Sequence, residues 1–549
     1  MAWTLQRYIF RELLKTFALS TIALILLFTS GMGLVKSFNV KDFSPGDMAR
    51  LFLFLVPLCA SFMMPISALF SAAVTYGRLA SDNEFDACKA SGINVHRLLL
   101  PAGVLALLVS LCTFSFSNYV VPHLTGQLDK MIEPALPQIF ARELAHRGYI
   151  TVRNRYAIYA DEVEQVSSSE QTPSGEEQLR HYVVLNHAAF IQYEGEEPSV
   201  FGTAAGATVE FRSVGGEHKV EAGLHNVRVF DWKRHTFIEE DYRPVEGAGI
   251  ALPIKQKPKF WNLNELLHYR RHPAEAPGVV DKIERLRMEL ASFLYCRSLA
   301  DLLREPGGQV ELSSEQRRYT VEAEEVSIRE QDGSLKLRGP VIVDAQPGKT
   351  RHLRANEATL RGQWMMPYRD KIKFSLQISL RGDVQIEDPD AKAIGGSLSK
   401  PTEDLRPLPL PPSILDATRL YSDADLIDEE VALPLSGKPA DGRARLCADV
   451  FKLVHKIGGI LHMRLAYSSC ALVLVVLGAA LGVIVRGGQV LTAFGVSFIP
   501  AMFVIVAIIM GRQLAENTNT ASIGVAIIWG SMLVTAALNP VIIRRFMQR

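Results

Sequence analysis

Six stretches near the two ends of the chain are long and apolar enough to cross a membrane. A spanning helix needs about 20 mostly apolar residues. Each stretch reaches that length without a single Asp, Glu, Lys or Arg; they are Thr16–Val35, Leu51–Thr75, Leu98–Asn118, Leu465–Val485, Val490–Met510 and Ile523–Ile543. The pattern therefore predicts three spans before, and three spans after, one long and more polar segment.

The polar segment alternates short runs of β-forming residues with turn residues, after a predicted helix over Gln127–Leu144. A first block contains Tyr149–Val152, Tyr156–Tyr159, Tyr182–Leu185, Ala189–Tyr193, Thr208–Phe211 and Val227–Phe230. A second block contains Arg318–Ala323, Leu335–Leu337, Val341–Val343, Ala358–Leu360, Ile372–Leu380 and Val384–Ile386. Such spacing favours an antiparallel sandwich or a jelly roll.

These patterns predict an α+β membrane protein whose large β-jelly-roll-like domain is inserted between the third and fourth spans. Its predicted parts are 1–120, 121–462 and 463–549, with β units at about 145–255 and 315–390 and a helical segment over 260–303 between them. Pro401–Pro412 indicates an extended spacer, and Arg443–His455 indicates a helix that leads back to the membrane.

Basic residues in the short flanks of the spans set the expected orientation. Arg7, Arg11 and Lys15 precede the first span, and Arg78, Lys89 and Arg97 lie between the second and third. The chain ends with further arginines, whereas the opposite side has fewer basic residues. Both termini are therefore expected in the cytoplasm, and the polar segment in the periplasm of a bacterium with two membranes.

The chemistry of the chain excludes several classes of protein. A net charge of +1 gives no reason to expect nucleic acid, and no motif of a protease, a hydrolase, a metal site or a cofactor site is present. Gly348-Lys349-Thr350 lacks the first glycine of a phosphate-binding loop, because Val343 stands there, so a β-turn is expected. Cys296 and Cys447 are either two free thiols or a disulfide. A non-catalytic protein is predicted.

The spans also lack the ionisable residues that ion-driven carriers place inside the membrane. If the protein transports a substrate, the energy is therefore expected to come from another subunit.

The loop Tyr76–Pro101 between the second and third spans carries the most specific pattern. Ser81 and Glu84 fit a capping box, which predicts a short helix over about Asp82–Ser91 along the membrane surface. Gly92 is placed to end that helix, and Asn94 to cap the next one.

This loop resembles the cytoplasmic coupling helix of the LptF/LptG (YjgP/YjgQ) permease family of the lipopolysaccharide exporter. The N-terminal RYIFRELLKTF and the three-plus-three layout are similar to that family as well. The resemblance implies an inner-membrane permease subunit that pairs with a second LptF/LptG-type permease. A cytoplasmic ABC ATPase dimer, LptB-like, would dock on the coupling helices, and lipopolysaccharide would pass to periplasmic LptC/LptA-like β proteins.

The resemblance also assigns candidate residues. Glu84 matches the acidic position of the coupling helix and Gly92 its terminating glycine, with Asp82 and Asp86 as neighbouring acidic candidates. Asp86 departs from the small or hydroxyl residue that is usual in the family, and Glu84 has the alternative of a purely capping role. Lys36 and Arg50 lie where the family has basic residues that meet lipid phosphates, although snorkelling is an ordinary alternative.

The polar segment is longer than one family jelly roll requires. Two similar runs within it, LRGPVIV and LRGDVQI, resemble the bridge-forming β domains of the same export system, which suggests a second β domain in this chain. Two other functions remain open. The protein could be a mechanotransmitting membrane subunit of the ABC type, or a receptor or scaffold with a β ectodomain.

Overall fold

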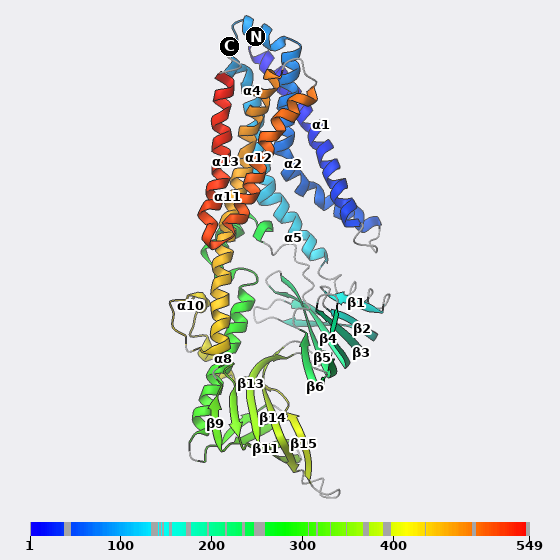
Figure 1. The fold of residues 1–549 in the computed structure, drawn as a ribbon, viewed down its shortest axis with the longest axis vertical. Coiled ribbons are helices and arrows are strands. Elements are labelled where there is room, and N and C mark those ends of the chain that lie inside the picture. The colour runs from blue at the N-terminus through cyan, green and yellow to red at the C-terminus, as the bar shows by residue number, and fades with distance from the viewer. Residues whose placement is uncertain are drawn as a thin grey trace. The chain divides into compact units, whose positions relative to one another are not determined.

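A computed structural model describes most of the chain (Figure 1). The described residues are 2–37, 45–132, 141, 144, 148–152, 156–171, 177–194, 197–214, 217–232, 236–245, 258–305, 307–314, 317–329, 331–346, 349–365, 373–387, 397–433, 435–485 and 490–544. Contacts divide the chain into two units. Met1–Asp129, Ile254–Pro273 and Phe451–Arg549 form the helical unit, and Lys130–Pro253 and Ala274–Val450 form the inserted unit.

The helical unit holds the predicted spans. Its helices are α1 (Ala2–Ser37), α2 (Pro45–Ser81), α3 (Glu84–Ala90), α4 (Val95–Ser115), the π-helix η1 (Phe116–Val120), α5 (Val121–Ile132), η3 (Pro258–Phe260), α7 (Leu263–Arg271), α11 (Gly437–Ile484), α12 (Val490–Ala515), η6 (Thr518–Thr520) and α13 (Ala521–Ile542). The last residues of α5 and the first residues of α11 belong to the inserted unit. Among the described residues, six helices are long and apolar enough to cross a membrane, so the predicted number of spans is confirmed.

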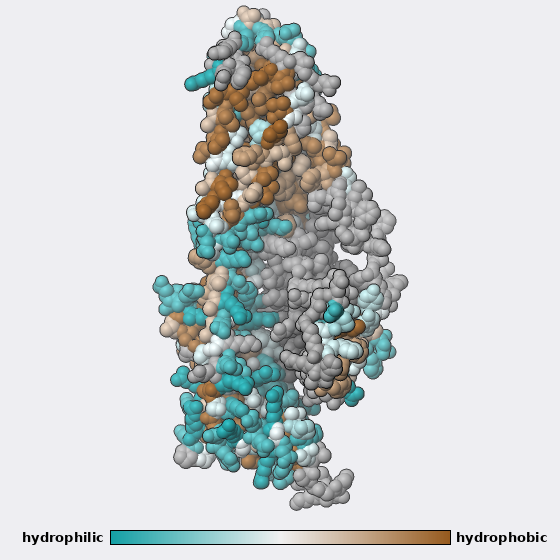
Figure 2. Space-filling model, in the orientation of Figure 1, coloured by the Kyte–Doolittle hydropathy of each residue, from teal (hydrophilic) through white to brown (hydrophobic). Residues whose placement is uncertain are grey.

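Helices α2 and α11 form the centre of the helical unit. One apolar cluster joins them to α1, α3 and α4, and a second joins them to α12 and α13. In each of these two spans 67% of the most apolar window is buried, against 17% for α1 and 28% for α13. Figure 2 shows mostly hydrophobic residues over the visible surface of the spanning helices, as contact with lipid requires.

Small residues allow α2 and α11 to approach closely. A Cβ atom at Gly478 would lie 2.8 Å from the carbonyl oxygen of Leu69, and one at Gly482 would lie 2.5 Å from that of Ala73. The two glycines are four residues apart and so face α2 on successive turns. Because lipid is as apolar as leucine, such backbone packing is a main source of attraction between membrane helices.

Replacing Gly482 by alanine tests this contact. The added methyl group would force α2 and α11 apart, and we expect G482A to lose about 1–3 kcal/mol of stability. Unfolding of the detergent-solubilised protein by a denaturing detergent measures the change. G530A in α13 is the matched control, because nothing lies within 4 Å of a Cβ atom there. Equal stability of the two variants would contradict the close contact.

The first sheet of the inserted unit contains six antiparallel strands in the order of the chain. They are β1 (Tyr149–Val152), β2 (Tyr156–Gln171), β3 (Glu177–Glu194), β4 (Glu197–Val214), β5 (Glu217–Asp231) and β6 (Thr236–Val245). Most of the strands are longer than the predicted runs, and β6 was not predicted. The runs Tyr182–Leu185 and Ala189–Tyr193 are both parts of β3, which continues through the polar residues between them.

A row of irregular positions crosses this sheet. It explains why the alternation of apolar and polar residues is interrupted between the two predicted runs of β3. Asp161, His187, Ala205 and Asn226 are left out of the regular register of neighbouring strands. His187 and Asn226 have φ values of 51° and 49°, in the left-handed region. The unpaired residue in each strand shifts the alternation by one while the pairing register stays the same, so the buried residues on both sides of the row form a single apolar cluster. The row lets the sheet bend without exposing its apolar face.

A second sheet and its helices complete the inserted unit. The strands are β7 (Val310–Ser313), β8 (Arg318–Glu322), β9 (Glu325–Ile328), β10 (Leu335–Arg338), β11 (Val341–Gln346), β12 (Lys349–Arg354), β13 (Glu357–Met365), β14 (Lys373–Glu387), β15 (Ser397–Asp404) and β16 (Leu408–Pro409). The helices are η4 (Pro273–Glu275), α8 (Val280–Leu303), α9 (Pro412–Thr418) and α10 (Asp423–Ile427). The first residue of η4, Pro273, still belongs to the helical unit. The apolar side of α8 packs on the sheet through Cys296, Leu299 and Leu303.

The path of this second sheet is β7-β8-β11-β12-β14-β13-β10-β9, and both β15 and β16 pair with β14. The prediction of an extended spacer over Pro401–Pro412 is therefore wrong, because much of this segment adds to the sheet. Gly348-Lys349-Thr350 lies where β11 turns into β12, as expected of a turn, with Gly348 outside the described residues. Cys296 and Cys447 are both free and buried, so they do not form a disulfide.

No strand of the first sheet pairs with a strand of the second in the part of the chain that is described. The residue ranges of the two sheets are compatible with the predicted β units at about 145–255 and 315–390. The division of the chain into these two β units stays a prediction. The helical segment between them is split: residues 254–273 belong to the helical unit, and α8 belongs to the inserted unit. The single polar block 121–462 of the sequence pattern therefore contains a segment that packs with the spans.

Candidate functional site

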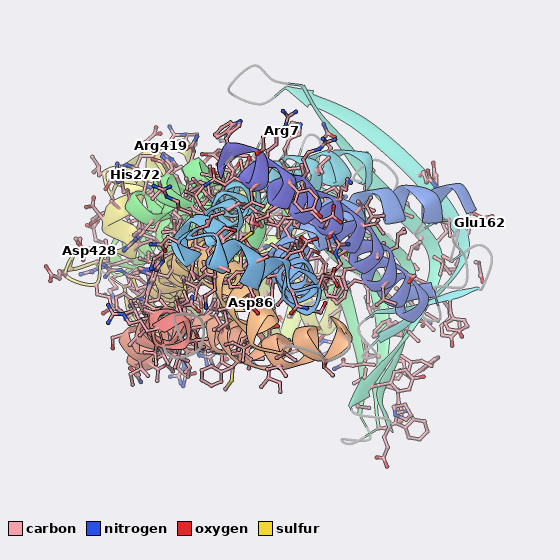
Figure 3. All side chains as sticks on the ribbon, turned by 90° about the horizontal axis from the view of Figure 1, so that it is seen from above. Arg7, Asp86, Glu162, His272, Arg419 and Asp428 are labelled. Atoms are coloured by element: carbon pink, nitrogen blue, oxygen red, sulfur yellow. The ribbon has the colours of Figure 1, made fainter. Side chains whose placement is uncertain are left out.

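The helix α3 lies at the end of the helical unit where α1 begins and α13 ends (Figure 1). Figure 3 looks onto this end and labels Arg7 of α1 and Asp86 of α3. The chain leaves α2 at Ser81, forms the seven residues of α3 and enters α4 at Val95. The short helix that the sequence predicted in this loop is thus present.

The predicted start of this helix is wrong. Ser81 is the last residue of α2, and its hydroxyl group donates to the carbonyl oxygen of Arg78 at 2.9 Å. The residue before α3 is Asn83, whose φ of 58° is left-handed and whose side chain forms no capping bond. The capping box fails because α2 continues through Ser81, which leaves Glu84 as the first helical residue. A capping role therefore does not explain Glu84.

The predicted end of the helix is confirmed. Gly92 has a φ of 77°, which an L-residue with a side chain rarely adopts. Its N–H donates to the carbonyl oxygen of Lys89 at 2.9 Å, and the N–H of Ile93 donates to that of Cys88 at 3.1 Å. These two bonds form a Schellman motif. Asn94 then caps α4, since its side-chain oxygen accepts from the N–H of His96 at 2.9 Å.

One aromatic side chain fixes α3 to the bundle. Phe85 is 3% exposed and belongs to the cluster that contains Leu79 of α2 and Val95 of α4. Cys88 and Ile93 pack against the same cluster. Burial, together with the nearby Glu84 carboxylate, raises the pKa of the Cys88 thiol. A force applied to α3 would therefore reach α2 and α4 through packed side chains.

The acidic candidates lie on and beside the exposed side of α3. Glu84 and Asp82 are exposed, and Asp86 is half-buried. The structure thus brings together Asp82, Glu84, Asp86 and Gly92 within one short element. Lys36 lies in α1 and Arg50 in α2, but the side chains of both are outside the described part of the structure.

An ion pair beside α3 was not singled out from the sequence. The guanidinium of Arg78, near the end of α2, donates to the carboxylate of Glu12 in α1 at 2.7 Å. The sequence offered only the basic flank that contains Arg78, because the partners are 66 residues apart. The pair ties α1 to the turn of α2 that leads into α3.

Among the described residues, no group of three or more His, Cys, Asp or Glu could hold a metal ion. The arrangement offers a small surface with three acidic residues, packed onto the spans through Phe85.

Replacing Gly92 by alanine tests the helix end. Nothing lies within 4 Å of a Cβ atom at Gly92, so the cost of G92A comes from the positive φ alone. We expect about 1–2 kcal/mol of local destabilisation, seen as faster hydrogen exchange of the amides of α3. G103A in α4 is the control, since it also has open space but no positive φ. Unchanged exchange in G92A would contradict the Schellman geometry.

Part of the chain is similar to a known family of proteins. No curated protein matches the chain. Residues 7–246 match the family model described as lipopolysaccharide export system permease LptF/LptG. The matched part contains nearly all of the first three spanning helices, the whole of α3 and the whole first sheet. Residues 7–246 of the chain are therefore similar to the LptF/LptG family of lipopolysaccharide export permeases.

Proposed function

We propose that this chain is the permease subunit of an ATP-driven exporter that extracts lipopolysaccharide, or a related glycolipid, from the inner membrane. The match of residues 7–246 to the LptF/LptG family model supports a general role in lipopolysaccharide export. The observation that carries the finer proposal is α3, an exposed acidic helix held to the bundle by Phe85. The glycolipid would leave toward a periplasmic bridge of LptC/LptA-like β proteins.

In this proposal a separate subunit hydrolyses ATP. A cytoplasmic ABC ATPase dimer, LptB-like, docks on α3 and on the matching helix of a second LptF/LptG-type permease. Both termini then lie in the cytoplasm, at the same end of the bundle as α3. Exposed carboxylates such as Glu84 suit a basic or hydrogen-bond-donating surface on the ATPase, because complementary charges steer and orient docking.

The packing suggests how the movement would spread. Closure of the ATPase would push α3, and Phe85 would transmit the push to α2 and α4. The Arg78–Glu12 pair would carry it to α1. Helix α1 has the smallest buried share of the six spans, 17%, so it can shift with the least loss of packing. We propose α1 as the mobile wall of a lipid cavity that the second permease completes.

The first sheet is the proposed receiving surface. Apolar residues of β2 to β5 form one buried cluster on this sheet, and we propose that the acyl chains of a glycolipid enter between them. Among the described strands, β1 and β6 are the edges of this sheet. Edge strands offer unpaired backbone groups, so we propose that LptC/LptA-like proteins continue the sheet at an edge.

Replacing Glu84 by glutamine tests the docking role. E84Q keeps the shape of the side chain and removes its charge. Since Glu84 forms no capping box, we expect α3 to stay folded while the ATPase binds at least about tenfold more weakly. Co-purification of the ATPase and lipopolysaccharide-stimulated ATP hydrolysis measure the loss.

Ser81→Ala is the matched control. The Ser81 hydroxyl group donates only to neighbours in sequence, the carbonyl oxygen of Arg78 and the carboxylate of Asp82. We expect S81A to dock and export normally. If E84Q docks and exports as well as S81A does, the coupling role of Glu84 is refuted.

Reversing the charge at Lys36 tests contact with the lipid. A cation at the periplasmic end of α1 would attract the phosphates of the glycolipid, so we expect K36E to reduce its crosslinking to the spans several-fold. Arg50→Glu is the parallel variant, and K36R should keep crosslinking. Undiminished crosslinking and export in K36E would remove Lys36 from the lipid-binding residues.

A further inference from the structure

A buried arginine lies at the end of the helical unit opposite to α3. Arg464 of α11 is only 5% exposed and directly precedes the apolar run of its span. Burying a guanidinium group is costly unless its donors are satisfied. An arginine at this position therefore needs hydrogen-bond acceptors that offset the cost of burial.

The partners of Arg464 come from two other segments of the chain. One terminal nitrogen, Nη1, donates to the carbonyl oxygen of Trp261 at 2.8 Å and to the Asn118 side-chain oxygen at 3.2 Å. The other, Nη2, donates to the carbonyl oxygen of Lys259 at 2.8 Å. The carboxylate of Glu265 adds electrostatic attraction. All of these residues belong to the helical unit.

Each partner lies near a point where the chain passes between the two units. The crossings follow Asp129, Pro253, Pro273 and Val450. Asn118 precedes the first crossing, and Lys259 and Trp261 follow the second. Arg464 itself follows the fourth, and α7 leads to the third. One guanidinium group therefore joins all three segments of the helical unit that connect to the inserted unit.

The segment from η3 to α7 presents its carbonyl groups from a rigid frame. Trp261 is 2% exposed, and its ring packs on that of Tyr269 at 4.8 Å between centroids. Asn262 and Glu265 form a complete capping box at 2.8 Å for both bonds. Lys259 and Trp261 stand just before this cap, so their carbonyl oxygens are held in place for Arg464.

Asn118 is oriented in the same way. It lies in the π-helix η1, a widened turn of the kind often found at functional positions. Its side-chain nitrogen donates to the carbonyl oxygen of Phe114 at 2.9 Å, which leaves the side-chain oxygen to face Arg464.

We propose that Arg464 is a clamp that holds together the three segments by which the chain leaves and re-enters the helical unit. It is a positioning residue: it fixes the base from which the inserted unit departs. Arginine suits this role because its planar fork serves several acceptors at once, whereas lysine is a point charge. The proposal concerns this chain's own packing and does not depend on lipid export.

Hydrogen exchange of the full chain in lipid nanodiscs tests the clamp. In R464Q we expect the amides of residues 258–271 to exchange at least about tenfold faster, since hydrogen bonds to a charged group are lost. R464K should fall between R464Q and the native chain. The amides of α2 and α3 should be unchanged in both variants.

R512Q is the matched control. Arg512 also lies near this end of the bundle, but it pairs with Glu516 of its own helix at 2.9 Å. We expect R512Q to leave residues 258–271 as in the native chain. Native exchange of this segment in R464Q overturns the proposal, and so does equal acceleration throughout all spans, which would mark a general folding role.

Asn118→Ala keeps the proposal testable if R464Q does not fold. It removes one bond and leaves the guanidinium with its two backbone partners, so exchange at 258–271 should rise by a smaller factor. Where R464Q does fold, the effect in the double variant N118A/R464Q should equal that of R464Q alone, because both changes break the same bond. Additive effects would show that the two residues act separately.

Discussion

The approach of α2 and α11 at Gly478 and Gly482 is the contact on which the helical unit depends. These two helices border both apolar clusters, so every other span is positioned by packing on one or the other. Without side chains at the two glycines, the backbones come close enough for many van der Waals contacts. The contact joins the first three spans to the last three, which are separated by more than 300 residues of sequence.

Around this centre, the two ends of the bundle use different physical means. At the end with α3, an apolar anchor, Phe85, leaves carboxylates exposed, and the Arg78–Glu12 pair remains partly accessible to solvent. At the opposite end, Arg464 is buried and bonded mainly to neutral groups. An exposed charge is available to a partner, whereas a buried charge with fixed acceptors specifies geometry.

In the first sheet of the inserted unit, a row of irregular positions keeps the apolar residues on one face. A regular alternation through β3 would place Leu185 and Ala188 on opposite faces, and the left-handed residue His187 between them brings both into one cluster. The same shift in β4 and β5 keeps the apolar face continuous across the bend. A sheet that curves in this way can enclose an apolar surface, as the proposed passage of a glycolipid requires.

The sequence alone determined the six spans, most of the β runs, the end of α3 at Gly92 and the family. Each of these depends on a local pattern: an apolar run, an alternation, or a glycine where the backbone needs a positive φ. The prediction of a helix start at Ser81 failed, because packing decides whether α2 ends before or after this residue. The prediction of a spacer over Pro401–Pro412 failed, because prolines can lie at a sheet edge.

Only the tertiary structure revealed the pairs that join distant parts of the chain. Glu12 and Arg78 are 66 residues apart, and Arg464 and Asn118 are 346 residues apart. No local pattern marks such partners, because nothing in the neighbouring residues of either one records which distant group will lie within hydrogen-bonding distance. The sequence thus determined which segments are long and apolar enough to cross the membrane, while folding decided which side chains hold those segments together.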